Sequence, residues 1–255
     1  MRSFLHQIPI IRRIYTSISV RLLKFLDKKK FLISFKGIKF LLNINEPIDK
    51  SIILFDYYEN EQLENTINLI SKHKANIFFD IGAHCGIYSL IIANKYTDIN
   101  VYSFEPVKMS YKRLLKNISL NPDIKNLKPL NYGLSNKNSK LKMKALIKKN
   151  YIQLGGFGVV KDGEDIKNKF SLISNFKKGD NIFKIKNRTI FLKIDVEGHE
   201  IKVLDGFKNL FKNNKVLIQI EIFPDNYNHV KQKMTELNFK EKNKIKSDFY
   251  FLKKN

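Results

Sequence analysis

Cysteine is almost absent from this chain of 255 residues, in which Cys85 is the only one. A single cysteine excludes an intramolecular disulfide and the zinc sites that require several thiolates. Long apolar runs are missing as well, because no stretch reaches the roughly 18 residues that indicate a membrane span. These absences favour a cytoplasmic protein that is at most peripheral to the cytoplasmic membrane.

Acidic side chains are scarce: 24 Asp and Glu stand against 47 Lys and Arg, which gives a net charge of +23. Residues 1–30 contain eight basic side chains and one acidic one, and residues 137–193 contain fifteen and four. Such an excess favours anionic partners such as phosphate backbones, anionic lipid headgroups or acidic glycans. The alternative is a compositional bias, because nearly all the basic residues are lysines in a chain rich in Asn and Ile.

The first 28 residues lack the continuous apolar block and cleavage site of a signal peptide. Their apolar residues recur every three or four positions, as on one face of a helix. These residues are Leu5, Ile8, Ile11, Ile14 or Tyr15, Ile18, Leu22 and Phe25. A basic amphipathic helix of this kind either lies on an anionic membrane or packs its apolar stripe against the domain.

The remaining pattern predicts one α/β domain with an N-terminal addition. Residues 31–44 are expected to form two short strands and residues 59–73 a helix, so that residues 1–75 pack on the core. From residue 76 to 255, strands and helices alternate, which predicts a doubly wound, mostly parallel sheet covered on both faces. A basic insertion at 137–188 interrupts this alternation.

A turn that follows the first strand of this sheet suggests a cofactor site. In FFDIGAHCGIYS (78–89), Gly82 allows a sharp bend, and Gly86 would let the backbone approach a ligand. Glu105 ends the next strand 23 residues after Gly82, where an acid can accept both hydroxyls of a ribose. Asp80 would repel the pyrophosphate of a dinucleotide but can hold the ammonium group of S-adenosylmethionine. The alternatives are plain turn chemistry and an ordinary strand end.

A second stretch, FLKIDVEGHE (191–200), ends another strand with a cluster of ionisable groups. Asp195 closes the strand, and Glu197, His199 and Glu200 follow within five residues. Such groups are costly to bring together unless they are paired, solvated or used in function. We therefore expect them at the same edge of the sheet as the first turn.

Together the two stretches resemble the FkbM family of S-adenosylmethionine-dependent methyltransferases. The DxGAxxGxxS motif of that family is matched by Asp80, Gly82, Ala83, Gly86 and Ser89. Its KxDxEGxExxxLxG motif is matched by Lys193, Asp195, Glu197, Gly198, Glu200, Leu204 and Gly206. His84 departs from the pattern, because the family more often has Asn at this position.

The resemblance implies a seven-stranded Rossmann-like methyltransferase fold and the cofactor S-adenosyl-L-methionine. It also implies O-methylation of a hydroxyl on a glycan, such as a polysaccharide, on a glycolipid or on another small metabolite. The cofactor-binding residues would then be Asp80, Gly82, Ala83, His84, Gly86, Ser89, Glu105 and Pro106.

Three residues are candidates for the general base that would accept the hydroxyl proton: Asp195, Glu197 and His199. His199 has the most suitable unperturbed pKa, about 6.5, but it can equally be a structural histidine. Glu197 and Glu200 can instead favour the dipole of the helix that follows. Oxygen ligands from this region and Glu221 would suit Mg²⁺, but the spacing is not diagnostic and no metal is predicted.

Two alternative functions remain at this stage. One is methylation of the 2′-hydroxyl of RNA ribose, which the positive charge suggests. Amino-directed nucleic-acid methylation is excluded by the absence of ProPro, and cytosine C5 chemistry by the position of Cys85 inside the cofactor turn. The other is a non-catalytic protein that binds a membrane surface or nucleic acid with the same fold.

Overall fold

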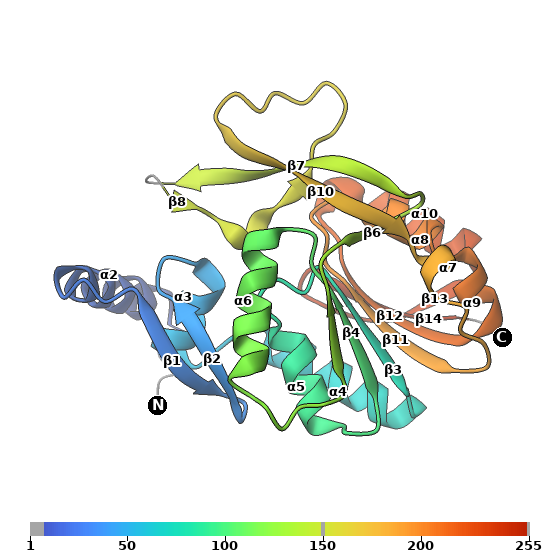
Figure 1. Cartoon of the computed structure of the whole chain (residues 1–255), viewed down its shortest axis with the longest axis horizontal. Helices are drawn as coiled ribbons and strands as arrows, with labels where there is room; N and C mark the ends of the chain where they lie inside the picture. The colour runs from blue at the N-terminus through green and yellow to red at the C-terminus, as the bar shows by residue number, and fades with distance from the viewer. Residues whose placement is uncertain (1–7, 149–150, 254–255) are drawn as a thin grey trace.

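A computed structural model describes residues 8–148 and 151–253 of the chain. Its centre is a seven-stranded sheet with the strand order β13-β14-β12-β11-β3-β4-β5 (Figure 1). Its parallel strands are β3 (Ile77–Ile81), β4 (Asn100–Phe104), β5 (Leu127–Leu130), β11 (Thr189–Ile194) and β12 (Lys215–Glu221). The strands β13 (Phe239–Ile245) and β14 (Asp248–Lys253) run antiparallel at one edge. The predicted doubly wound, mostly parallel α/β sheet is confirmed.

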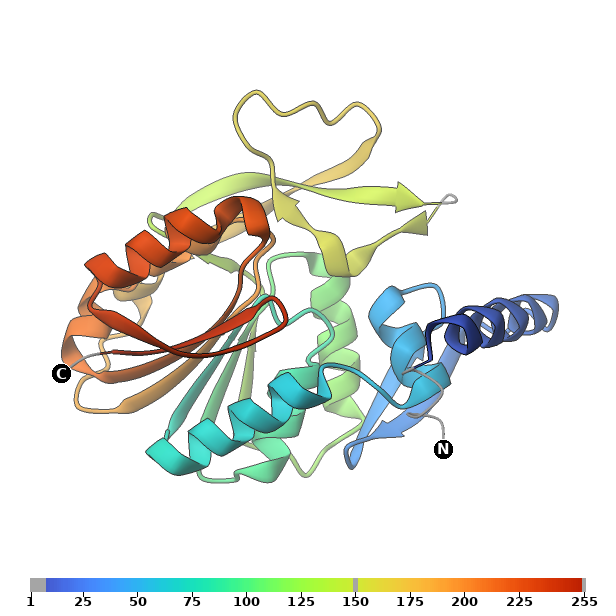
Figure 2. The same ribbon diagram turned by 180° about the vertical axis from the view of Figure 1, so that it is seen from behind.

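Helices cover both faces of this sheet, as Figures 1 and 2 show. One face carries α4 (Asn60–His73), α5 (Ile87–Lys95) and α6 (Lys108–Ser119). The other carries α8 (Glu200–Asp205), α9 (Lys208–Asn213) and α10 (Tyr227–Glu236), the last preceded by the short helix η2 (Pro224–Asn226). Successive residues of β3 point to opposite faces, so Phe78 belongs to the first apolar cluster and Phe79 to the second. Burial on both faces explains the continuous apolar runs in the sequence.

The order in which strands are added to the sheet reverses between β3 and β11, two parallel neighbours at its centre. From β3 the chain continues to β4 and β5 on one side, and it later returns to β11 and β12 on the other. In open α/β sheets, ligands bind outside the carboxyl ends of the strands at such a switch point. The ends of β3 and β11 are therefore where a site is expected.

A second, smaller sheet lies over the carboxyl ends of the central strands (Figure 1). It contains β6 (Gly133–Ser135), β7 (Ser139–Lys148), β8 (Tyr151–Ile152), β9 (Gly158–Val159) and β10 (Lys169–Lys178). The short helices η1 (Leu154–Gly156) and α7 (Gly179–Ile182) complete this region. The alternation of β7 turns Met143 and Ala145 inward and leaves Lys140 and Lys142 exposed.

The N-terminal elements lie on one side of the molecule, where their hairpin packs beside α6. They are α2 (Pro9–Phe25), β1 (Lys30–Phe35), β2 (Ile38–Asn43) and α3 (Pro47–Phe55). The hairpin buries Ile38, Phe40 and Leu42 in the cluster on the α5 face. Within the described residues, no helix is long and apolar enough to cross a membrane.

Helix α2 contacts this cluster through Tyr15, Val20 and Leu23, and the ring of Tyr15 lies 5.7 Å from that of Phe55. The apolar stripe predicted from the sequence, from Ile11 to Phe25, faces away from the domain. Tyr15, the alternative to Ile14 in that stripe, is the member that packs on the domain. Leu5, the first residue of that predicted stripe, lies outside the described residues.

Candidate active site

A cleft lies at the carboxyl ends of β3, β4 and β11, beneath the smaller sheet. Nine of the eleven site residues predicted from the sequence line it. They are Asp80, Gly82, Ala83, His84, Glu105, Pro106, Asp195, Glu197 and His199. The topology explains this convergence, because the carboxyl ends of neighbouring parallel strands meet at one edge of the sheet.

The two sequence motifs touch each other through their backbones. Gly82 has a φ of +89°, and a Cβ at this position would lie 1.9 Å from the carbonyl oxygen of Asp195. The amide of Asp195 in turn donates a hydrogen bond of 3.0 Å to the carbonyl of Ile81. Only glycine allows this approach, so Gly82 fixes the distance between the turn after β3 and the end of β11.

The remaining two predicted residues, Gly86 and Ser89, lie behind the cleft. Gly86 has a φ of +86°, and a Cβ there would lie 2.4 Å from the side chain of Leu114. It therefore makes room for α6, whereas the sequence suggested that it makes room for a ligand. The hydroxyl and the amide of Ser89 both donate to Oδ2 of Asp80, at 2.5 and 3.1 Å. Ser89 thus orients the carboxylate of Asp80.

Asp80 and Glu105 present buried carboxyl groups to the cleft, with exposed fractions of 2% and 6%. The two oxygens of Glu105 accept hydrogen bonds of 2.8 Å from the amides of His84 and Val107, one each. These bonds fix the carboxyl group and leave each oxygen a further lone pair. Burial raises the pKa of Glu105 to about 8. It also raises the pKa of Asp80, against the opposing charge of Lys193.

Lys193 brings a positive charge into the centre of the sheet. Its Nζ lies 2.9 Å from Oδ2 of Asp195 and 4.8 Å from the centre of the Tyr88 ring. Burial alone would raise the pKa of Asp195, but Lys193 more than offsets this effect and holds that pKa below its ordinary value. Burial and the nearby Asp195 raise the pKa of Glu221 to about 8. At neutral pH, Asp195 is therefore ionised and its neighbour Glu221 is protonated.

Glu197 and His199, which follow β11 in the chain, have very different environments. Glu197 has a φ of +51°, and burial followed by the charge of Asp195 raises its pKa to about 7. Nε2 of His199 lies 2.9 Å from Oγ of Ser135, and its ring packs edge-on against Phe176. Burial and then Lys202 lower the pKa of His199 to about 4, so the ring is neutral at pH 7. Glu197 thus has the pKa that is better matched to proton transfer at neutral pH.

Glu200 lies beside this region but turns away from the cleft. It is the first residue of α8, and its Oε1 accepts a hydrogen bond of 2.7 Å from the amide of Gly198. This geometry fits the interpretation that Glu200 stabilises the start of the helix. Among the described residues, no group of three or more His, Cys, Asp and Glu side chains is arranged to hold a metal ion.

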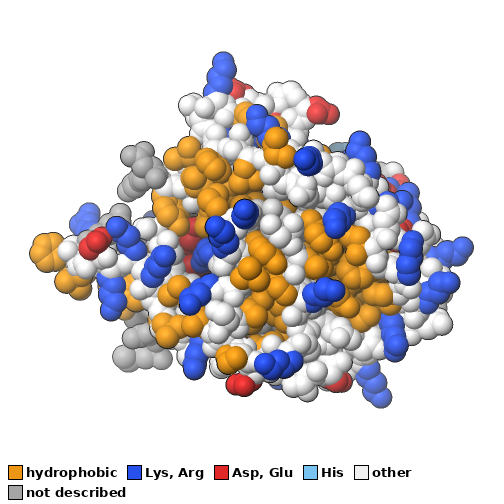
Figure 3. Space-filling model, in the orientation of Figure 1, with side chains coloured by type: hydrophobic (Ala, Val, Ile, Leu, Met, Phe, Trp, Pro, Cys, Tyr) orange, Lys and Arg blue, Asp and Glu red, His pale blue; other side chains and the backbone are white. Residues whose placement is uncertain are grey.

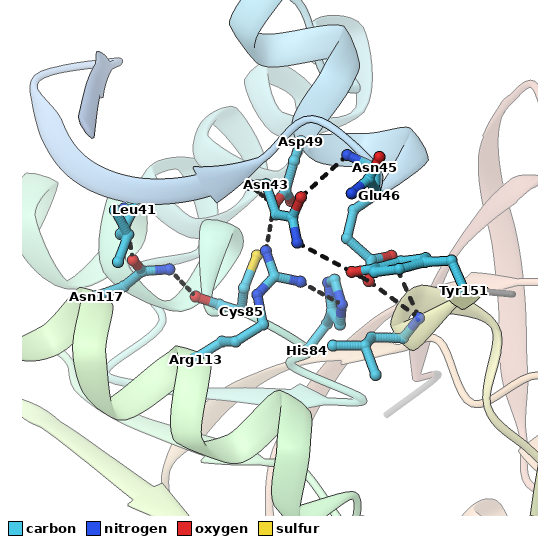
Figure 4. Close-up of polar contacts among 11 residues, drawn as sticks. Leu41, Asn43, Asn45, Glu46, Asp49, His84, Cys85, Arg113, Asn117 and Tyr151 are labelled. Carbon is cyan, nitrogen blue, oxygen red and sulfur yellow. Dashed lines mark hydrogen bonds and ion pairs between the residues drawn. The ribbon is translucent and has the colours of Figure 1, made fainter. Parts of the chain in front are cut away.

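A polar network that the sequence did not indicate joins His84 to the N-terminal elements (Figure 4). Arg113 of α6 lies between the ring of His84 and the carboxylate of Asp49, which it contacts in an ion pair. Asp49 also accepts a hydrogen bond of 2.7 Å from the amide of Asn43. Because these residues are far apart in sequence and lie in ordinary amphipathic elements, no local pattern could have linked them.

A second branch of the network holds the smaller sheet (Figure 4). The hydroxyl of Tyr151 donates to Glu46 at 2.8 Å and accepts from the side-chain amide of Asn43 at 3.1 Å. Glu46, only 1% exposed, also accepts from the amide of Leu154. The N-terminal elements thus contact both the turn after β3 and the wall of the cleft.

The part of the smaller sheet that faces the cleft is apolar. Met143, Leu154, Phe157, Val159 and Phe176 line it. The lysines of this region lie elsewhere: Lys144, for example, forms an ion pair with Glu164, and Lys161 lies beside Gly198. The cleft therefore combines carboxyl groups at the strand ends with an apolar and aromatic roof.

Comparison with known proteins identifies relatives. The methyltransferase FkbM domain matches residues 80–241. The hexuronic acid methyltransferase AglP of Haloferax volcanii is 26% identical over 148 residues, which are 57% of this chain and 56% of that protein. The methyltransferase sdnD of Sordaria araneosa is 27% identical over 151 residues, 50% of this chain and 58% of that protein. The chain thus aligns with little more than half the length of these relatives.

Among solved structures, a human methyltransferase 10 domain containing protein superimposes with a TM-score of 0.49 at 10% identity, covering 94% of both chains. The TYW2 protein of M. jannaschii, in complex with AdoMet, gives a TM-score of 0.41 at 12% identity, covering 88% of this chain and 84% of that one. The domain match spans more than half of the chain and includes Asp80, Glu105 and Asp195. The chain therefore belongs to the FkbM family of methyltransferases.

Proposed function

We propose that the chain transfers the methyl group of S-adenosyl-L-methionine, the cofactor of its family, to a hydroxyl oxygen of a glycan, a glycolipid or another small metabolite. The observation that carries this proposal is the convergence of Asp80, Glu105 and Asp195 on one cleft at the switch point of the sheet.

The residues of the cleft fit this cofactor. Asp80 would hold the ammonium group of its methionine part, and Glu105 would accept the ribose hydroxyls on lone pairs that its backbone hydrogen bonds leave open. The carboxylate of Asp195, which stays ionised, would repel the pyrophosphate of a dinucleotide, which argues against that cofactor class. When bound, the cofactor supplies an electrophilic methyl group on a sulfonium.

The protein's part in the reaction is to hold an acceptor in line with the cofactor and to remove a proton. Holding two reactants in a productive geometry contributes a large share of the rate in such transfers. We assign proton removal to Glu197, because its pKa of about 7 matches the working pH. Asp195, which stays ionised beside Lys193, would orient the acceptor hydroxyl through a hydrogen bond.

The shape of the cleft favours an acceptor with one apolar side. Phe157 and Phe176 form part of its roof, and the exposed Lys161 lies two residues after Val159, the lining residue that ends β9. An anionic sugar would place its ring under the aromatic side chains and its charge near such a lysine. The relative that methylates a hexuronic acid supports this acceptor class.

The first test is a titration with S-adenosylmethionine followed by thermal unfolding. Cofactor at 100 times its Kd should stabilise the protein by about 2.7 kcal/mol, and the variant Glu105→Gln should respond less at the same concentration. The matched control Glu236→Gln changes a half-exposed glutamate outside the cleft and should respond as the unchanged protein does. Absence of any shift would favour a non-catalytic protein.

The second test follows radiolabelled methyl transfer to three acceptors: oligosaccharides with uronic acids, neutral oligosaccharides, and RNA. We expect transfer to the uronic acid series. Transfer to RNA ribose alone would overturn the proposed acceptor class while leaving the methyltransferase assignment in place.

A further inference from the structure

Helix α2 turns large apolar side chains toward solvent. On α2 and the residue that follows it, seven such side chains have exposed fractions between 41% and 86%. They are Ile10, Ile11, Ile14, Ile18, Leu22, Phe25 and Leu26. Scattered exposed apolar residues are normal, but a gathered set marks an interaction surface.

The exposed residues form one continuous stripe. Successive helix residues are rotated by about 100°, so Ile11, Ile14, Ile18 and Leu22 lie above one another on the same side. Val20 and Leu23, which contact the domain, lie on the opposite side, and Tyr15 reaches the domain from the margin of the stripe. The helix is therefore held by its contacts with the domain and turns the stripe outward, and Figures 1 and 2 show α2 at the edge of the molecule.

The charges around this stripe have one sign. Residues 9–26 contain no Asp or Glu, whereas Arg12, Arg13 and Arg21 are exposed and Lys28, Lys29 and Lys30 follow the helix. Asp27 is the acidic residue nearest to the helix in the sequence, and Lys29 pairs with it at 2.8 Å. In the space-filling view, hydrophobic and basic side chains occur together on the part of the molecule that α2 occupies (Figure 3).

We infer that the exposed face of α2 docks on the surface of an anionic phospholipid bilayer. An apolar stripe with basic flanks matches both layers of such a surface, the acyl chain boundary and the negatively charged headgroups. A second copy of the chain fits less well. A symmetric pairing through this face would bring the arginines of two helices together without acidic partners.

This inference goes beyond the proposed function and does not depend on it. The two are nevertheless compatible in space: α2 contacts α3 through Tyr15 and Phe55, and Ile48 of α3 lines the cleft. Docking through α2 would bring the cleft close to acceptors held at a membrane.

The test is sedimentation of the full chain with vesicles of phosphatidylcholine, with and without 30% phosphatidylglycerol. We expect binding to the anionic vesicles that weakens as salt is raised. The triple variant Ile14→Ser/Ile18→Ser/Leu22→Ser should bind at least about tenfold more weakly. The variant Arg12→Gln/Arg13→Gln/Arg21→Gln should lose about fivefold in affinity per cation removed.

Matched controls separate the helix from general surface effects. Ile173→Ser changes an isoleucine that is 71% exposed on β10, and Lys72→Gln/Lys74→Gln/Lys125→Gln removes three exposed cations outside α2. Both should bind vesicles within about twofold of the unchanged chain. Circular dichroism should show that all variants remain folded.

Three results would overturn the inference: equal binding to neutral and anionic vesicles, unchanged binding by the stripe variant, or a dimer that the stripe variant dissociates in light scattering. The last result would assign the face to a second copy of the chain. None of these measurements uses methyl transfer, so failure here leaves the proposed function untouched.

Discussion

A terminal nitrogen of Arg113 lies 3.2 Å from Nε2 of His84, at the turn where the family more often has Asn. Arginine only donates hydrogen bonds, so Nε2 of His84 must accept and the ring must carry its proton on Nδ1. Burial and then the charge of Arg113 lower the pKa of His84 to about 3, which keeps the ring neutral. Arg113 is thus a positioning residue for a side chain that lines the cleft.

We predict that Arg113→Lys weakens binding of S-adenosylmethionine by about tenfold. Lysine lacks the planar fork that bridges His84 and Asp49, so the histidine loses its donor and turns more freely. Isothermal titration calorimetry measures the effect, and Arg188→Lys, at an exposed arginine, serves as the control. An unchanged Kd with a lowered Tm would reduce Arg113 to a purely structural role.

Glu105 makes stability depend on pH in a defined direction. Its pKa is about 8 in the folded protein and about 4.5 when unfolded, so the folded state retains the proton between these values. Its contribution to stability is therefore complete below pH 4.5 and is lost as the pH rises through 8. As the pH rises between these two values, the free energy of unfolding should fall by at most about 1.4 kcal/mol per pH unit.

Urea unfolding without cofactor at pH 6.5, 7.0, 7.5 and 8.0 tests this prediction. Glu105→Gln should show a shallower fall than the unchanged protein, whereas Glu236→Gln should follow it. The lowered pKa values of His84 and His199 act with the opposite sign below about pH 6.5, which is why the range starts there. Parallel curves for Glu105→Gln and the unchanged protein would contradict the assigned pKa.

The convergence of Asp80, Glu105 and Asp195 could be predicted from the sequence for a simple reason. Asp80 lies near the end of β3, and Glu105 and Asp195 directly follow β4 and β11. The topology of a parallel sheet places these strand ends at one edge. Residue identity and spacing then suffice to suggest a cofactor, because the side chains that would bind it lie at the strand ends and in the turns that follow them. The same logic placed Glu197 and His199 near the cleft.

Contacts between distant elements could not be predicted in this way. Arg113 and Asp49 are 64 residues apart, and their ion pair depends on how α3 packs beside α6. The periodicity of α2 revealed an apolar stripe but not which side of the helix meets the domain. The packing of Gly86 could not be predicted for a related reason, since its missing Cβ accommodates Leu114 of another helix.

The proposed base gives a prediction about the pH dependence of catalysis. The pKa of Glu197 is about 7, so kcat/KM should fall as the pH is lowered through 7. Glu197→Gln should remove this limb of the profile and reduce kcat by about 10² to 10⁴. Steady-state rates between pH 5.5 and 8.5, with the acceptor that supports turnover, measure both effects.

His199→Gln is the discriminating variant for this assignment. His199 bonds Ser135 and has a pKa of about 4, so its loss should change KM more than the position of the acidic limb. If His199→Gln abolishes the limb and Glu197→Gln retains it, the histidine is the base.

The closest backbone approach in the site makes Gly82 the residue least open to substitution. In Gly82→Ala the new methyl group would meet the carbonyl of Asp195 at 1.9 Å, which the two motifs can relieve only by moving apart. Gly37 is the matched control, because its φ of +82° is nearly the same and no atom lies within 4 Å of its absent Cβ. Gly37→Ala should therefore lower the free energy of unfolding by the conformational cost alone, about 1–2 kcal/mol.

Gly82→Ala should lower the free energy of unfolding by about 1–3 kcal/mol more than Gly37→Ala. It should also weaken cofactor binding, because the two backbone segments that are forced apart carry Asp80 and Asp195, which line the cleft. Chemical denaturation gives the first quantity and calorimetry the second. Equal losses of stability in the two variants would mean that the strands shift without cost, and Gly82 would then not fix the spacing of the two motifs.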